Sequence, residues 1–145
     1  MQLENWKRPA LNVALEEIEV EGLGLDLHRK LRLVGLTYGI DPTSATLGWA
    51  AVAPLIAIRG GQALPISGLA LHCSGIARFE VSFQTEPPGQ LEYLELRRDP
   101  EDTLVFFFEG GTVRISCERC RAELILDGED EPLSDGEAGA GGLVQ

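Results

Sequence analysis

The sequence predicts an all-β fold, an antiparallel β-sandwich or flattened barrel of about eight to ten short strands. Three observations favour this fold. Apolar and β-branched residues alternate with polar ones over much of the chain. Turn residues separate these runs at intervals of roughly 8 to 12 residues. A strongly marked hairpin occupies residues 103–126, and we expect the rest of the chain to be organised around it.

Two apolar runs, residues 104–108 and 112–117, flank the adjacent Gly110 and Gly111. Paired glycines supply the positive φ angles of a tight hairpin turn at little steric cost. The first run is apolar on both faces, which indicates a strand covered on both sides. We therefore expect the core to form around it. Leu104, Phe106 and Phe108 share one face, and Val105 and Phe107 share the other.

The return strand changes faces after Cys117, because its inward positions resume at Cys120. A strand with a period of two cannot switch faces without an inserted residue or a turn. Glu118 and Arg119 are therefore expected to form a bulge or a tight reversal. Either would bring Cys117 and Cys120 to the same side.

The chain before residue 41 divides into three parts. Residues 1–10 indicate an arm that Trp6 holds to the body. Residues 11–20 fit either a strand or one short N-terminal helix, and we favour strand from residue 17 to 27, with Gly22 as a bulge. Residues 31–40 predict another strand, in which the apolar positions change face at Gly35.

The middle of the chain predicts a series of strands separated by glycine and proline. Residues 43–77 contain a single formal charge, Arg59, and should supply much of the interior. A turn at Ser74 and Gly75 is expected to end one strand and start the next. The predicted strands are residues 46–53, 55–58, 66–73, 77–83 and, after a loop, 91–96.

Composition predicts one β-domain, residues 1–126, followed by an acidic, glycine-rich flexible tail, residues 127–145. The tail has six acids, five glycines and no base. Such a segment cannot bury enough apolar area to offset the entropy lost on ordering. The whole chain carries a net charge of −11, and the tail holds six of those negative charges, which leaves −5 on the predicted domain.

Charge and hydropathy exclude several function classes. With 12 bases against 23 acids, the chain lacks the basic surface that binds nucleic acid or anionic membranes. No export signal is visible at the N-terminus, and the longest uncharged run, residues 43–58, is shorter than a membrane span of ~20 residues. We expect a cytoplasmic protein with its three cysteines reduced.

The sharpest candidate for a chemical site is Cys117-x-x-Cys120, joined by Cys73 and by His72 or His28. Such a pair of thiols can supply two ligands to a tetrahedral zinc ion. His72 and Cys73 are neighbours, however, so on a strand their side chains would point to opposite faces. Inert core thiols are the favoured interpretation. A zinc site and a redox-active pair are the alternatives.

No catalytic motif is present, so we expect a protein that is not an enzyme and needs no cofactor. Glu17, Glu19 and Glu21 would project from one face of a strand and are the candidate residues for binding a basic protein partner.

In size and acidity the chain is similar to bacterial immunity and inhibitor proteins that neutralise basic toxins. The leading hypothesis is therefore a non-catalytic protein-binding domain of the inhibitor or immunity type. One alternative is a zinc-supported β-domain that uses Cys73, Cys117 and Cys120. The other is a structural subunit of a homo-oligomer, in which residues 77–83 form an edge strand that pairs with a second copy.

Overall fold

The computed structural model describes residues 1–40, 42–98 and 100–127, and no helix occurs among them. The predicted all-β class is confirmed, and the short N-terminal helix is wrong. Residues 11 and 15 instead form isolated bridges to Leu96 and Leu94. The described residues form ten strands: β1 (Gln2–Glu4), β2 (Glu17–Val20), β3 (Leu23–Asp26), β4 (Leu31–Ile40), β5 (Thr43–Ala51), β6 (Ile56–Arg59), β7 (Gln62–Phe83), β8 (Leu91–Arg98), β9 (Asp102–Phe108) and β10 (Gly111–Leu126).

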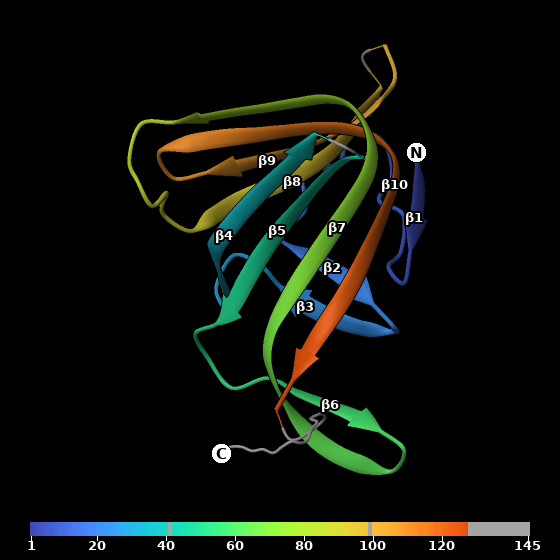
Figure 1. Ribbon diagram of the computed structural model, residues 1–145. Coiled ribbons are helices and arrows are strands. Elements are labelled where there is room, and N and C mark those ends of the chain that lie inside the picture. Colours follow the sequence, from blue (N-terminus) through green and yellow to red (C-terminus); the bar gives the residue numbers. More distant parts are fainter. Residues whose placement is uncertain (41, 99, 128–145) are drawn as a thin grey trace.

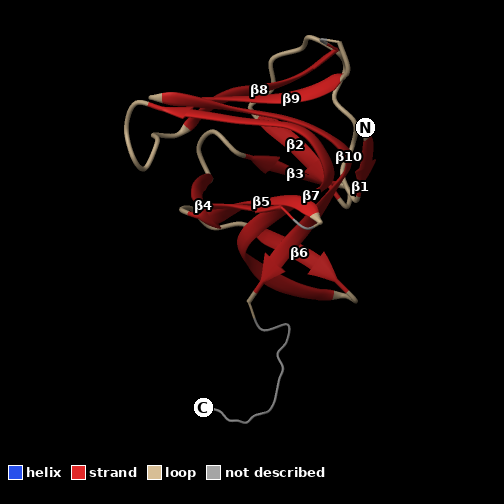
Figure 2. Ribbon diagram, turned by 45° about the horizontal axis from the view of Figure 1, so that its top comes forward, coloured by secondary structure: helices blue, strands red, loops and turns tan. Residues whose placement is uncertain are grey.

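The main sheet follows the order β4-β5-β7-β10-β9-β8, and all these neighbours are antiparallel. At its margins β1 pairs with β10 in parallel, and β6 pairs with β7. The sheet is strongly bent, so that β4 and β5 cross in front of β8 and β9 (Figure 1). A separate β2–β3 hairpin lies between these two groups of strands (Figure 2). The result is a sandwich and not a closed barrel.

The bend forms where β7 and β10 pass together from one layer to the other. Gly75 lies at this point with a φ angle of 64°. A Cβ there would lie 2.6 Å from a carboxylate oxygen of Glu118 on β10. The predicted turn at Ser74 and Gly75 is wrong, because β7 remains paired with β10 on both sides of Gly75. Because the two strands stay paired, the chain does not reverse at Gly75, and the whole sheet bends there instead.

The predicted change of face in β10 is confirmed, but the predicted bulge or tight reversal at Glu118 and Arg119 is wrong. Cys117 and Cys120 are both buried, whereas Glu118 and Arg119 between them are exposed. The strand continues through these residues, and the shift in register lies between Ser116 and Cys117. The extra residue belongs to the partner strand, β7, which explains why the sequence of β10 alone could not locate it.

The two other glycines at changes of face behave differently from each other. Gly35 lies at a register shift between β4 and β5, which confirms the predicted irregularity there. Gly22 is not a bulge. Glu21 and Gly22 have φ angles of 52° and 82° and form a two-residue turn between Val20 and Leu23. Positive φ at both positions is typical of the tight turn that joins hairpin strands.

The core lies between the two layers of the bent sheet. Trp49 of β5 packs against Phe106 of β9, with ring centroids 5.9 Å apart. Both faces of β9 are covered as predicted, since Phe106 and Val105 are each 0% exposed. Phe107 is half-buried and stacks on Tyr93 of β8, 4.5 Å between centroids. The triple-phenylalanine strand is thus central to the packing.

The N-terminal arm runs from β10 to the edge of β8. Trp6 is buried, and its indole N–H donates a hydrogen bond to the Cys120 carbonyl at 3.2 Å, which confirms its predicted role. The backbone N–H of Lys7 bonds to the carbonyl of Glu19 at 2.8 Å. Leu15 and Leu94 exchange two backbone hydrogen bonds of 2.9 and 2.8 Å. The arm is therefore fixed at both ends, with β2 on one side.

Candidate functional site

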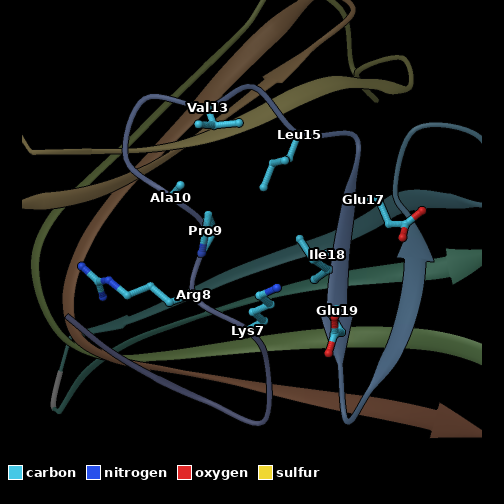
Figure 3. Close-up of a pocket in the computed structure, with 9 residues that line it drawn as sticks. All are labelled: Lys7, Arg8, Pro9, Ala10, Val13, Leu15, Glu17, Ile18 and Glu19. Carbon is cyan, nitrogen blue, oxygen red and sulfur yellow. The ribbon is translucent and has the colours of Figure 1, made fainter.

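A groove of about 440 Å³ lies between the N-terminal arm and strand β2 (Figure 3). Its walls are the two sides of one loop of the chain, which the backbone bond from Lys7 to Glu19 joins at one end and the continuous chain from Leu15 to Glu17 joins at the other. The lining is apolar in the centre and charged at the rims. The lining residues are Lys7, Arg8, Pro9, Ala10, Val13, Leu15, Glu17, Ile18 and Glu19.

The alternation of β2 sets the chemistry of one wall. Ile18 points inward and is 4% exposed, whereas Glu17 and Glu19 are exposed on the outer side. Val13 on the opposite wall keeps 42% of its surface exposed. A bound side chain could therefore gain apolar contact with the arm and a carboxylate contact with β2.

Two of the three glutamates predicted to bind a partner lie together. Glu17 and Glu19 share the exposed side of β2, and the Glu17 carboxylate lies over Gly24 of β3, where any Cβ would overlap it. Glu21 is displaced, because β2 ends at Val20 and Glu21 begins the turn. Its carboxylate pairs instead with Arg59 at 2.8 Å. The acidic strip is thus two residues long.

The opposite rim is basic. Lys7 and Arg8 lie there, and the Arg8 guanidinium forms an ion pair with Asp102 of β9. This hydrogen bond from Arg8, with a second from Arg98, lowers the pKa of Asp102 to about 2. Arg8 is thereby held in place by a carboxylate outside the groove. The groove is thus bordered by Glu17 and Glu19 of β2 and by Lys7 and Arg8 of the arm, with the Glu17 carboxylate turned towards β3 and the Arg8 guanidinium towards Asp102.

The candidate metal residues separate into two groups. Cys73, Cys117 and Cys120 are free, buried thiols that meet across β7 and β10, with 3.5 Å between the sulfurs of Cys73 and Cys120. Hydrogen bonding to Cys73 and burial raise the pKa of Cys117 well above its usual range. For Cys73, the hydrogen bond with Cys117 lowers the pKa, but that with Cys120 and burial outweigh it and raise the pKa.

The histidines do not join these thiols. His72 points to the opposite face of β7, as its position beside Cys73 predicted, and its ring nitrogens contact Thr46 at 3.3 Å and Glu123 at 2.8 Å. The His28 ring is bound to the Leu91 carbonyl at 2.5 Å. Within the described ranges, no three His, Cys, Asp or Glu side chains are arranged to hold a metal ion.

We expect the three thiols to be inert. Thiolate is the form that reacts and binds metal, and the raised pKa values of Cys73 and Cys117 suppress it, while Cys120 is 0% exposed. A disulfide reagent should label none of the cysteines in the folded protein and all three after unfolding in denaturant. Metal analysis of protein purified without added zinc should give a stoichiometry near zero. About one zinc per chain, lost together with folding on chelation, would contradict this prediction.

No protein-family model, curated protein or solved structure matches the chain. No helix that could cross a membrane is present in the described part of the chain.

Sequence reasoning identified one wall of the groove and missed the other. The alternation of β2 is a local signal, and it placed Glu17 and Glu19 on one side. Residues 8–13 of the arm lie outside the named strands, and Leu11 and Asn12 are bonded to Leu96 of β8. Their position depends on this contact, on the bond from Lys7 to Glu19 and on the ion pair of Arg8 with Asp102. The one sequence signal for a charged rim is the pair of basic residues before Pro9, Lys7 and Arg8.

Proposed function

We propose that this protein is a non-catalytic protein-binding domain of the inhibitor or immunity type, and that it takes a basic partner along the β2 groove. One observation supports this function most. Glu17 and Glu19 stand on the same exposed side of β2, beside a groove with an apolar centre. A charged rim around apolar surface is the usual organisation of a protein-binding site.

The groove can contribute to binding in two ways. An apolar side chain of the partner would pack against Val13 and Leu15, which line the arm. Lysine or arginine side chains would meet Glu17 and Glu19. The net charge of −11 would speed the encounter with a cationic protein at low salt. Lys7 and Arg8 on the other rim would fix the orientation by repelling a partner bound the wrong way round.

The chemistry of the remaining side chains favours binding over catalysis. The three thiols are buried with raised pKa values in Cys73 and Cys117, so they are poor nucleophiles. His72 and His28 are occupied by Glu123 and by the Leu91 carbonyl. Neither histidine is positioned to activate a thiol. Three free cysteines also suit a reducing compartment, and we propose the cytoplasm.

The test is a charge reversal on β2. Used as baits in an extract of the source cells, wild-type protein and Glu17→Lys/Glu19→Lys should differ in one basic protein that only the wild type retains. With that protein purified, the double variant should lose at least about tenfold in association rate at low salt, because electrostatic steering is removed. The wild-type rate should fall as salt is raised.

The matched control is Glu92→Lys/Glu101→Lys, which changes the net charge equally at two exposed positions outside the groove. This control variant should still bind the partner. Loss of the partner from both variants would show that only overall charge matters and would overturn the assignment to the groove. A retained protein whose binding ignores ionic strength would overturn the electrostatic mechanism.

A further inference from the structure

The second half of β7 forms an open edge of the main sheet. Phe79, Val81 and Phe83 pair on one side with residues of β10. On the other side β5 ends its pairing with β7 at Ser74, and no described strand pairs its backbone with residues 79–83 there. In Figure 1 this part of β7 runs along the upper rim of the molecule, with β10 beneath it. The sequence predicted this stretch as an edge strand.

Backbone groups at this edge point outward. The N–H of Gln84, directly after β7, donates to the carbonyl of Gly110, directly before β10, at 2.7 Å. In an antiparallel pair, alternate residues direct both backbone groups to the same neighbour. The backbone N–H and C=O groups of Glu80 and Ser82 are therefore directed to β10. Those of Phe79, Val81 and Phe83 are directed to the open side. Such a row is a template for another strand.

The same residues carry apolar side chains that the fold covers only in part. Phe79 and Val81 lie opposite the buried Ile115 and Val113, so they belong to the inner face of the sheet. Val81 is nevertheless 40% exposed. Phe79 stacks on Tyr38 of β4, 5.0 Å between centroids, and Tyr38 is 48% exposed. A strand added to this edge would bury apolar surface as well as pair the backbone.

We propose that a second copy of this chain occupies the edge, with the two β7 strands antiparallel and centred on Phe79. The charges of Arg78 and Glu80 favour this register over one centred on Glu80. Arg78 and Glu80 lie on the outer face, within one chain 3.1 Å apart. A centre at Phe79 places Arg78 of each chain opposite Glu80 of the second copy, which gives two favourable pairs. A centre at Glu80 would place two glutamates directly opposite each other.

The proposal adds a property that the groove does not imply. The residues of the β2 groove and those of the β7 edge do not overlap. A dimer would therefore carry two grooves, one on each copy, joined through one continuous main sheet, and a multivalent partner could bind both. By contrast, residues 33–40 of β4, at one end of the main sheet, carry no charge that could select a register.

The experiment is a charge exchange followed by measurement of the mass in solution. Wild-type protein should have twice the 15.7 kDa chain mass in sedimentation at about 100 µM. Glu80→Arg and Arg78→Glu should each weaken dimerisation by about tenfold, since like charges then oppose each other twice. Mixed in equal amounts, the two variants should form a heterodimer, because every arginine of E80R faces a glutamate of R78E.

The mixture separates pairing between chains from the pair within one chain. Each variant has like charges at positions 78 and 80, so mixing cannot restore the ion pair within one chain. A dimer that forms in the mixture must therefore come from contact between chains. A wild-type monomer, or a mixture that stays monomeric, would overturn the proposal. Glu80→Gln tests the register, because it should weaken a dimer centred on Phe79. If it strengthens the dimer, the centre lies at Glu80 and the proposed register is wrong.

Discussion

Gly68→Ala is expected to lower the free energy of unfolding by about 3 kcal/mol, the upper range for an overpacked core position. Gly68 is a buried residue of β7 that lies across from Ala50 of β5. A Cβ at this position would overlap the backbone carbonyl oxygen of Trp49. Backbone cannot rotate away as a side chain can, so β5 and β7 must separate. Urea unfolding of the purified variant measures the loss.

Gly35→Ala is the matched control for this substitution. Gly35 is also a strand glycine, in β4, but nothing lies within 4 Å of the position its Cβ would take. The change should be neutral or stabilising by up to about 1 kcal/mol, because alanine loses less entropy on folding. Equal losses in the two variants would show that Gly68 matters only as a glycine in a strand and not through its contact with β5.

Phe106→Ala should cost about 3 to 5 kcal/mol of the free energy of unfolding. The Phe106 ring is completely buried and contacts Trp49 across the two layers. Its removal leaves a cavity at the centre of the core. Since small domains have about 5 to 15 kcal/mol in total, a sizeable fraction of the variant should be unfolded at moderate temperature. Thermal unfolding followed by circular dichroism gives the shift.

Phe107→Ala tests the same strand at the next residue. Phe107 lies on the other face of β9, half-buried, between Tyr93 and the Arg97 guanidinium, which is 5.2 Å from the ring centre. Its loss removes less buried area, and the cost should be about 1 to 2 kcal/mol. A larger cost at Phe107 than at Phe106 would mean that the two faces of β9 are assigned the wrong way round.

The positions of the strands could be predicted because alternation is a local property. The bounds of β4 and the run of three phenylalanines follow directly from it. The structural roles of the three glycines at changes of face could not be distinguished from the sequence. The same local signal becomes a register shift at Gly35, a hairpin turn at Gly22 and a bend of the sheet at Gly75. Which outcome occurs depends on the neighbouring strand, and a single sequence does not reveal that strand.

In the candidate site, too, local features could be predicted from the sequence and contacts between distant residues could not. Alternation placed Glu17 and Glu19 on one side of β2, but it also included Glu21, which the turn and the pair with Arg59 remove. The approach of Cys73 to Cys120 required the pairing of β7 with β10, which joins residues 47 positions apart. The wall formed by the arm depends on backbone bonds to β2 and β8 and on the ion pair of Arg8 with Asp102 of β9. Long-range contacts of this kind leave no periodic pattern in a sequence.

The measurement that tests the proposed function most directly is the association rate of the purified partner with wild-type protein, Glu17→Lys/Glu19→Lys and Glu92→Lys/Glu101→Lys, each at low and high salt. We predict a fast, salt-sensitive rate for the wild type and the control. The β2 variant should be slower by at least about tenfold at low salt. Three equal rates would contradict the claim that the carboxylates beside the groove receive a basic partner.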